Sequence, residues 1–318
     1  MAEYINIRGQ NIEVVASDPA NPTIGQIWYN STSNTLKGQA FQAAGWATGG
    51  NLPLTNYGLA SAGTATAGLA FGGTTPATFP PDYTATTNEY DGTSWTAGGN
   101  MALNRTERGG TGLQTAALAA AGEAGATNAT EEYNGSTWTT GGNMAAPNYG
   151  IRGFGTQTAA VMASNLSVEE YDGSSWTTVN PLSAARNYTF SGGVASPQTA
   201  GWIAGAGTPN AQTEEYDGTN WTAGGNLNTG RQFGGGAGSL TTAIAMTGSN
   251  PGGITNLTEL YDGTSWSSTA TTSTSREDAK GAGTSASAFI AGGRNPTVLS
   301  ATEEYTGAGP VTQTITAS

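Results

Sequence analysis

The sequence predicts an all-β fold made of six copies of one four-stranded antiparallel sheet, and three observations predict it. Six tryptophans, from Trp46 to Trp266, recur at a mean spacing of about 44 residues, which is the repeat length of a β-propeller blade. The 49 glycines in 318 residues suit tight turns and strands that crowd around an axis. A unit of Tyr, Asp or Asn, Gly, two small polar residues and Trp occurs at residues 90–95, 133–138, 171–176, 216–221 and 261–266.

Each predicted blade contains four short strands. An Asn or Arg precedes a Gly-rich segment, which we expect to be the innermost strand, and a short apolar run follows as the second strand. A polar loop of variable length leads to a Glu-Tyr strand, and an Asp-Gly or Asn-Gly turn then leads into the Trp strand, which is typical of a β-hairpin. The six apolar runs are residues 69–71, 116–121, 159–163, 202–204, 243–246 and 288–291.

The two ends of the repeat region complement each other. The last repeat has an apolar run and Tyr305 but no following Trp, whereas Trp46 has no apolar run before it. We therefore favour a six-bladed β-propeller over residues 46–318 in which the Trp46 segment is the outer strand of the last blade, so that no sheet edge is left open. Residues 311–315 alternate well after a Gly-Pro turn and are the alternative outer strand.

Residues 1–45 do not follow the repeat and predict a small N-terminal extension. Residues 26–37 are typical of a β-hairpin, residues 18–22 form a Pro-containing linker, and residues 12–15 are a candidate strand. A hairpin of this size is not stable alone. We expect it either to pack on the propeller or to dock the protein onto a neighbouring subunit.

The composition excludes several classes of function. The chain has no Cys and no His, which excludes zinc sites, iron–sulfur clusters, Cys nucleophiles and the Ser-His-Asp triad. The formal charge of −12 argues against nucleic acid as a partner. The N-terminus has no signal-peptide pattern and the longest apolar run, residues 116–121, is too short to cross a bilayer. We expect no metal, no cofactor and no membrane insertion.

Paired glutamates recur before the repeated tyrosines, at residues 131–132, 169–170, 214–215 and 303–304. A catalytic pair is needed once and not in every blade, and neighbouring residues on a strand point to opposite faces. We expect structural roles, with one Glu per blade pairing with a repeated cation at Arg105, Arg186, Arg231 or Arg276. If exposed, such a pair would stabilise the fold by about 0 to 1 kcal/mol.

The repeat resembles the kelch repeat, because an apolar strand ending in a Gly doublet, as at residues 72–73 and 292–293, is followed by Glu-Tyr, Trp and Arg. The chain is also similar to the kelch-like structural proteins of tailed bacteriophages, of the marine and cyanobacterial phage type. This resemblance rests on residues 20–32, on the repeated Glu-Glu-Tyr-Asp-Gly-Thr-Ser-Trp-Thr and on the ending at residues 314–316. It implies a tail-fibre-like virion protein, made in the host cytoplasm, with other virion proteins as partners. It implies neither a particular ligand nor an oligomeric state.

The sequence lacks the residue patterns of two enzyme families that have propeller folds. Copper oxidases of the galactose oxidase kind need His ligands and a modified Cys, which this chain lacks. The Asp-Gly-Thr-Ser-Trp units resemble the Asp-boxes of sialidases, but Asp and Trp are one residue too close and Tyr replaces the leading Ser. We interpret these units as hairpin turns and expect no catalytic residues. Acids that lie outside the repeated strand positions include Glu107, Glu123, Glu277 and Asp278.

A binding face is expected where the repeats differ. The loops between the apolar strand and the Glu-Tyr strand vary in length, and in kelch-like propellers they share a face with the connections between blades. Aromatic rings stack on sugar faces, and polar side chains bond sugar hydroxyls. The candidate ligand-binding residues in these loops are Phe79, Asp82, Tyr83, Asn210, Asn250, Arg294 and Asn295. The aromatic residues of the connections, Tyr57, Tyr149, Tyr188 and Phe233, either contribute to this face or fill space between blades.

These observations lead to a non-enzymatic virion protein whose propeller loops bind a host-surface glycan or protein receptor. The alternative is a purely structural subunit, such as a head decoration or a baseplate-associated protein. A propeller hydrolase or a host adaptor is less favoured. The sequence does not place the protein in the tail, the baseplate or the head.

Overall fold

The computed structural model describes residues 12–76, 82–123, 125, 127–206 and 210–316, and strands are the only regular structure in this part of the chain. It therefore contains no helix that could span a membrane. The chain forms two compact units. One comprises Trp46–Thr306, and the other combines the described residues of Met1–Gly45 with those of Gly307–Ser318.

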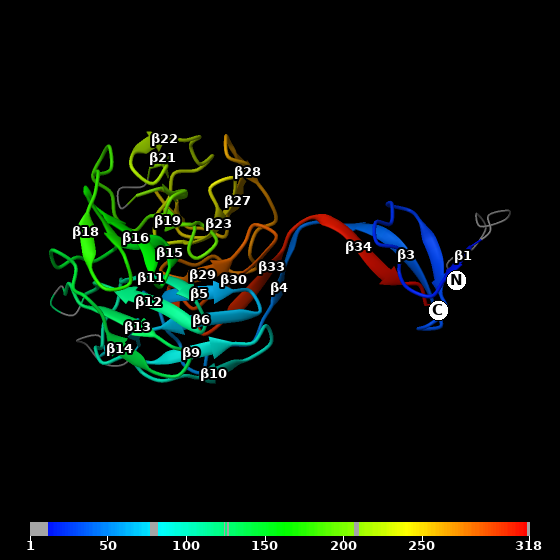
Figure 1. The fold of residues 1–318 in the computed structure, drawn as a ribbon, viewed down its shortest axis with the longest axis horizontal. Coiled ribbons are helices and arrows are strands. Elements are labelled where there is room, and N and C mark those ends of the chain that lie inside the picture. The colour runs from blue at the N-terminus through cyan, green and yellow to red at the C-terminus, as the bar shows by residue number, and fades with distance from the viewer. Residues whose placement is uncertain (1–11, 77–81, 124, 126, 207–209, 317–318) are drawn as a thin grey trace. The chain divides into compact units, whose positions relative to one another are not determined.

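The larger unit contains six four-stranded sheets among its described residues, each antiparallel throughout (Figure 1). From the inner to the outer strand, the first three are β5 (Ala60–Thr64), β6 (Ala67–Phe71), β9 (Thr87–Tyr90) and β10 (Trp95–Ala97); β11 (Gly109–Leu113), β12 (Ala116–Ala120), β13 (Thr130–Tyr133) and β14 (Trp138–Thr140); and β15 (Arg152–Thr156), β16 (Ala159–Ser164), β17 (Ser167–Tyr171) and β18 (Trp176–Thr178). The next three are β19 (Phe190–Ser191), β20 (Gly201–Ala204), β21 (Thr213–Tyr216) and β22 (Trp221–Ala223); β23 (Gly235–Ser239), β24 (Thr242–Met246), β27 (Thr258–Tyr261) and β28 (Trp266–Ser268); and β29 (Lys280–Gly283), β30 (Ser287–Ala291), β33 (Thr302–Thr306) and β4 (Gly45–Thr48).

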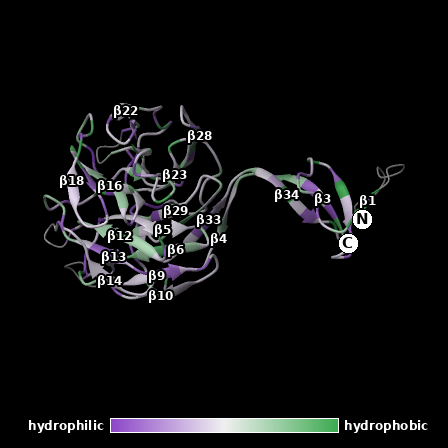
Figure 2. Cartoon of the chain, in the orientation of Figure 1, coloured by the Kyte–Doolittle hydropathy of each residue, from purple (hydrophilic) through white to green (hydrophobic). Residues whose placement is uncertain are grey.

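The inner strands of these sheets contact one another in a closed order. β5 contacts β11, β11 contacts β15, β15 contacts β19, β19 contacts β23, β23 contacts β29, and β29 contacts β5 again. Hydrophobic residues are concentrated on second strands such as β6 and β16, where they pack between neighbouring sheets (Figure 2). Three short hairpins extend the loops that follow second strands: β7 (Thr74–Thr75) with β8 (Asp82–Tyr83), β25 (Ser249–Asn250) with β26 (Gly253–Ile254), and β31 (Arg294–Asn295) with β32 (Thr297–Val298).

The Trp46 segment closes the last sheet, because β4 lies beside β33 as its outer strand. The alternative, in which residues 311–315 take this place, is wrong. These residues belong to β34 (Gly309–Thr314), which pairs with β3 (Thr35–Gln42) in the smaller unit. The predicted boundary of the propeller at residue 318 is corrected accordingly, since the propeller unit ends at Thr306.

The smaller unit is a four-stranded sheet in the order β1 (Glu13–Val15), β2 (Ile27–Asn30), β3 and β34. The predicted hairpin is formed by β2 and β3, and it is completed by β34 on one side and by β1, parallel to β2, on the other. The Asp18 carboxylate accepts hydrogen bonds from Trp28 Nε1 at 3.0 Å and Asn30 Nδ2 at 2.7 Å, and it forms an ion pair with Lys37 Nζ at 2.7 Å. The bonds from Lys37, Asn30 and Trp28 lower the pKa of Asp18 to about 2. The predicted linker therefore supplies the polar centre of this sheet.

The paired glutamates have structural roles, as expected, and the two members of a pair do different work. The first forms an ion pair with the repeated arginine in three pairs: Arg105–Glu131 at 2.9 Å, Arg186–Glu214 at 2.7 Å and Arg276–Glu303 at 2.6 Å. The single Glu259 pairs with Arg231 in the same way, whereas Glu169 accepts from the Ala145 N–H instead. The ion-paired side chains are at most 4% exposed, so the expectation for exposed pairs does not apply. The second accepts a hydrogen bond from a tyrosine of the next sheet, as from Tyr171 to Glu132 at 2.5 Å and from Tyr216 to Glu170 at 2.8 Å, and the single Glu89 accepts from Tyr133 at 2.6 Å.

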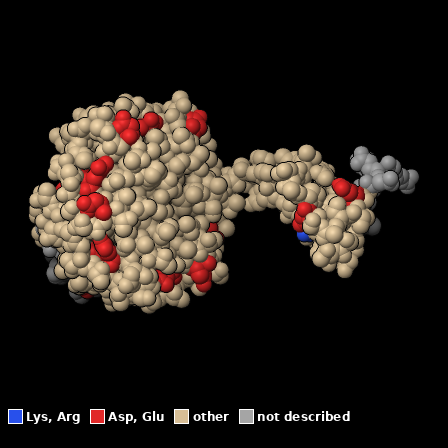
Figure 3. Space-filling model, in the orientation of Figure 1, with Lys and Arg blue, Asp and Glu red and all other residues tan. Residues whose placement is uncertain are grey.

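Burial of the arginines changes the surface charge of the propeller. Seven of its eight basic residues are at most 5% exposed, and only Arg294 is not buried. On the face of the propeller drawn in Figure 3, acidic side chains are visible at several places and basic ones are not. Seven acidic residues are buried as well, so the net charge of the surface stays as the composition gives it, but almost every cation is removed from the surface.

Candidate functional site

A closed ring of backbone hydrogen bonds lies at one end of the inner strands. Each member of the ring is two residues before the start of an inner strand, and its N–H donates to the carbonyl of the member before it at 2.7 to 3.2 Å. The first member closes the ring by donating to the last. The six members in order are Gly58, Glu107, Gly150, Tyr188, Phe233 and Asp278. The same position in six repeats thus carries five different residue types.

All six members have the left-handed backbone conformation, with φ between +48° and +63°. Gly58 and Gly150 adopt it freely, but bulky side chains such as those of Tyr188 and Phe233 rarely do. Each non-Gly residue held there costs about 1 to 2 kcal/mol. Such strain persists where the surrounding structure fixes it, and it is concentrated at functional sites. The ring is therefore a candidate functional site.

The loops that follow the second strands return to this ring. Antiparallel bridges join Tyr57 to Thr74, Thr106 to Glu123, and Glu277 to Arg294. Each bridge places a loop residue beside the residue that precedes a ring member. Loops and connections from different sheets consequently share one face of the propeller.

A cavity of about 240 Å³ opens on this face. Its lining combines four aromatic side chains with three carboxylates and one guanidinium, and two threonines complete it. The rings of Tyr188 and Phe233 lie 4.5 Å apart, at an angle of 48°. The lining residues are Tyr57, Tyr83, Tyr188 and Phe233, then Glu107, Glu123 and Asp278, then Arg294, and finally Thr74 and Thr106.

Arg294 connects the charged and aromatic parts of the cavity. Its Nη2 lies 2.9 Å from Asp278 Oδ2 and its Nε lies 3.3 Å from Glu277 Oε1. Its guanidinium also sits 5.0 Å from the centre of the Tyr57 ring, which is a cation–π distance. On the other side of Gly58, Arg152 Nη2 lies 3.2 Å from Glu107 Oε2. The two acidic members of the ring are thus each paired with a cation from another segment.

The surroundings of Asp278, Glu107 and Lys280 shift the pKa values of all three side chains. Burial, with a contribution from Glu107, raises the pKa of Asp278 to about 7. Burial opposes the ionisation of Glu107, but Lys280 and Arg152 outweigh it and lower the pKa of that carboxyl. Burial and the neighbouring Arg152 lower the pKa of Lys280 to about 8. Near neutral pH, Asp278 and Lys280 are therefore the groups closest to losing or gaining a proton.

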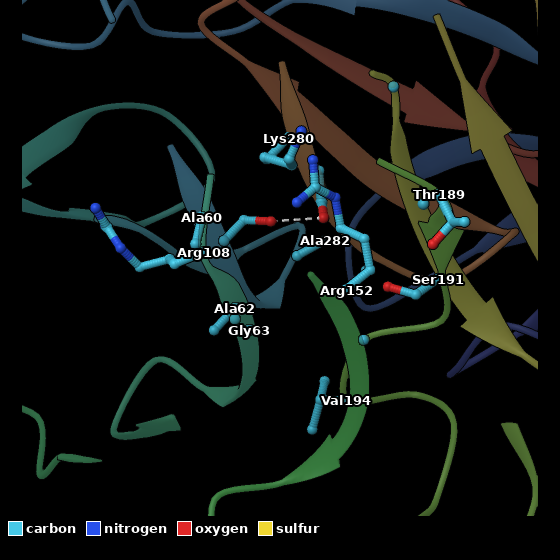
Figure 4. A pocket seen from close by; sticks show the side chains of 17 residues that line it. Ala60, Ala62, Gly63, Arg108, Arg152, Thr189, Ser191, Val194, Lys280 and Ala282 are labelled. Atoms are coloured by element: carbon cyan, nitrogen blue, oxygen red, sulfur yellow. Dashed lines mark hydrogen bonds between the residues drawn. The ribbon is translucent and has the colours of Figure 1, made fainter. Parts of the chain in front are cut away.

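Beneath the ring, between the inner strands, lies a second and much smaller cavity of about 30 Å³. Figure 4 shows Arg152 and Lys280 beside it, while the side chain of Arg108 extends away from both. Arg108 instead donates to the Phe71 carbonyl at 2.7 Å. A volume of about 30 Å³ matches the space of one water molecule. The inner strands around the smaller cavity therefore form the floor of the larger one, and a ligand in the larger cavity stops at that floor.

The structure brings together only some of the predicted site residues. Tyr83 and Arg294 line the larger cavity, whereas Asp82, Asn210, Asn250 and Asn295 are not part of its lining. Phe79 lies outside the described residues. Asn210 Oδ1 caps its own turn by accepting from the Gln212 N–H at 3.2 Å, and Asn250 Oδ1 accepts from the Gly252 N–H at 2.8 Å. These two amides therefore stabilise loops.

Glu107, Glu123 and Asp278 were not among the candidate residues, yet they supply the carboxylates of the cavity. The sequence does contain a signal for them, because they are acids that break the repeated pattern. The departure of Tyr188 and Phe233 from Gly58 and Gly150 at the aligned position is a second signal. Among the described residues, no group of three or more acidic side chains is arranged to hold a metal ion.

Comparison with known proteins bears on the fold. No family model matches the chain, and no curated protein matches it. The solved structure of YjhT aligns with a TM-score of 0.65 and 11% sequence identity, over 82% of this chain and 99% of that one. The fold is a β-propeller. The all-β and propeller predictions are thereby confirmed, and at this level of identity the likeness extends to the fold alone.

Proposed function

We propose that this chain is a non-enzymatic, tail-fibre-like virion protein whose propeller binds a host-surface glycan in the larger cavity. The observation that carries the proposal is the strained ring. Four bulky or charged residues occupy left-handed positions that Gly58 and Gly150 fill without strain, and all four line one cavity. The four side chains held at these positions all open onto the same cavity, as the side chains of a binding site do.

The lining favours a sugar as the ligand. Its volume of about 240 Å³ lies below the range of about 300 to 1,000 Å³ typical of pockets for drug-sized molecules, so a small ring fits better than an extended ligand. Tyr57, Tyr188 and Phe233 offer ring faces for stacking, while the carboxylates of Glu107 and Asp278 accept hydrogen bonds from hydroxyls.

The ion pairs favour binding over hydrolysis. A glycosidase needs two carboxyl groups that face the scissile bond, one as acid and one as base or nucleophile. Here Glu107 is paired with Arg152, and Asp278 with Arg294. Of the three lining carboxylates, Glu123 alone has no ion pair within the described chain, so no two unpaired carboxyl groups face one bond there. The virion assignment rests on the resemblance of residues 20–32 and of the repeats to tailed-phage proteins.

The proposal is tested by measuring binding of the isolated protein to an array of bacterial surface polysaccharides. We expect saturable binding, and at least a tenfold loss in a variant carrying both Tyr188→Gly and Phe233→Gly. Glycine already occupies the aligned positions 58 and 150, so the backbone of the variant is preserved. Phe41→Ala is the matched control, because Phe41 is an exposed aromatic residue of β3 in the smaller unit. Undiminished binding by the double variant would exclude the cavity, and no binding by the unaltered protein would favour a purely structural subunit.

A further inference from the structure

We propose that the cavity recognises a terminal sugar unit that carries a free, protonated amino group, which it holds between the carboxylates of Asp278, Glu107 and Glu123 and the neighbouring aromatic rings. This inference rests on the proposed function, since it names the class of sugar that the same site takes. Three features of the described residues lead to it.

The first feature is the charge balance around the ring. The three cations there are already engaged: Arg152 with Glu107, Arg294 with Glu277 and Asp278, and Lys280 with the Ala279 carbonyl at 3.2 Å. The nearby buried Arg108 donates to the Phe71 carbonyl instead. Among the described residues, Glu123 is therefore the one acid of the lining without a cationic partner. Outside this cluster, every other basic residue of the propeller is buried. The acids that line the cavity are Glu107, Glu123 and Asp278, and Glu277 pairs with Arg294 beside it.

The second feature is an unsatisfied acceptor. Asp278 Oδ1 is buried and has no hydrogen-bond partner within the described chain, and the side chain as a whole is 3% exposed. A buried acceptor without a donor is unfavourable, and Asp278 is part of the cavity lining. A hydroxyl could donate to it, but an ammonium group brings three donors together with a positive charge for the unpaired Glu123.

Protonation of Asp278 supports this choice. Burial and Glu107 raise its pKa to about 7, so in the free protein the carboxyl keeps its proton for about half of the time at neutral pH. A ligand cation near Oδ1 favours the ionised form and lowers the pKa again. Binding of an ammonium group near pH 7 should therefore release protons from Asp278.

The third feature is the aromatic lining. Arg294 already shows that a cation is accepted here, since its guanidinium lies 5.0 Å from the Tyr57 ring centre. The rings of Tyr188 and Phe233 offer the same attraction to a ligand cation. An acidic sugar meets the opposite conditions, because the carboxylates repel it and Arg294 is already held by Glu277 and Asp278.

The floor of the cavity explains why the recognised unit is terminal. Below the backbone ring, the space between the inner strands is about 30 Å³, which is too small for a sugar. A glycan chain cannot pass along the axis. It enters end-on, with its last unit in the cavity.

Isothermal titration calorimetry of the full chain tests the inference with four probes: glucosamine, glucose, N-acetylglucosamine and glucuronic acid. At pH 7 we expect glucosamine to bind at least tenfold more tightly than glucose or N-acetylglucosamine, and glucuronic acid to bind most weakly. Titrations in two buffers of different ionisation enthalpy should show a release of protons from Asp278 on glucosamine binding. Equal or weaker binding of glucosamine relative to glucose overturns the inference.

Three variants sharpen the test. Asp278→Asn should abolish both the proton release and most of the preference for glucosamine. Glu123 is an exposed acid of the cavity lining, so we expect Glu123→Gln to leave the fold intact. This variant should reduce the preference for glucosamine over glucose by about threefold. Asp91→Asn is the matched control, because Asp91 lies in an outer hairpin turn where Asn134 occupies the equivalent position. It should change nothing, and an equal effect of Asp91→Asn would overturn the inference by showing that only net charge matters.

The two proposals fail differently. If no probe and no bacterial polysaccharide binds, the proposed function is wrong and the inference is wrong with it. If neutral glycans bind in the cavity and glucosamine has no advantage, the proposed function stands and the inference alone is overturned.

Discussion

The outer contacts between sheets and the ring at the axis are both built from aligned positions of the same repeat, yet they differ in how uniform they are. At the outer contacts the same partners recur, with Tyr to Glu and Arg to Glu in most sheets. At the ring the aligned position carries Gly, Glu, Gly, Tyr, Phe and Asp. Within one chain, the recurring contacts hold the sheets together, and the varied positions are free to form a site.

The largest expected effect concerns a recurring contact. Arg231→Ala removes one partner of the buried Arg231–Glu259 ion pair and also the bonds from Arg231 to the Thr247 and Ala245 carbonyls. Because the Glu259 carboxylate is left buried and unpaired, we expect the free energy of unfolding to fall by about 3 to 5 kcal/mol. Urea denaturation measures this loss.

Asn148 provides the control for that change, because it takes the place of the repeated arginine in the third sheet and makes no ion pair within the described chain. Asn148→Ala should cost less than about 1 kcal/mol. A similar loss for both variants would show that the position matters through the backbone and not through the ion pair.

A smaller effect is expected from a hydroxyl between sheets. Tyr133→Phe removes the bond to Glu89 and should destabilise the fold by about 1.5 kcal/mol, as for bonds to charged groups. Tyr305→Phe is the matched variant, because Leu260 replaces the glutamate there and Tyr305 bonds the Thr269 hydroxyl at 3.0 Å instead. It should cost about 0.5 to 1 kcal/mol. Equal losses would contradict the importance of the carboxylate.

The same hydroxyl predicts a dependence on pH. Burial and the bond to Glu89 raise the pKa of Tyr133 to about 12, whereas an exposed phenol titrates near 10. The native state therefore holds its proton longer than the unfolded state, and this contribution to stability is lost as the pH rises from about 10 to about 12. Absorbance titration of the tyrosines, compared between the native protein and Tyr133→Phe, should show one late-titrating phenol fewer in the variant.

At the ring the sign of the pH effect is set by Asp278. Its pKa is about 7 in the folded protein and near 4 when unfolded, so the native state binds more protons between these values. The contribution of Asp278 to stability therefore falls as the pH rises through this window. Asp278→Asn should flatten the decline between pH 4.5 and pH 7.5 in urea denaturation. An unchanged slope would show that Asp278 is ionised throughout.

The smallest effect on stability is expected for Phe233→Gly. The loss of packing against Tyr188 is offset by relief of the left-handed strain at φ +60°, so the net change should stay within about 1 kcal/mol. Thermal denaturation measures it. A loss as large as that of Arg231→Ala would remove the distinction between the ring and the outer contacts.

The regular parts of the fold could be predicted because they are repeated: turn residues, the Tyr and Trp of the outer hairpin, and the apolar second strands recur in register. The ion pairs could be predicted as pairs, but their burial could not, because it depends on how closely neighbouring sheets pack. Residues 311–315 were ambiguous for a physical reason, since an alternating strand fits the edge of either sheet equally well.

The candidate site was predicted in part. Variable loops pointed to Tyr83 and Arg294, and both line the cavity. Glu107 and Asp278 were noted only as acids outside the repeat. They lie 171 residues apart and become ring neighbours of Gly58 only when the last sheet meets the first. A relation of that kind is set by closure of the ring, and no local pattern in the sequence carries it.

The chain passes between the two units twice, once from β3 to β4 and once from β33 to β34. Within the propeller β4 lies beside β33, and within the smaller unit β3 is paired with β34 over six residue pairs. A protease that cuts one of these crossings severs the chain but leaves every strand with its neighbours. The two units are thus doubly tethered, and a single nick at residues 43–44 or 307–308 would release neither of them.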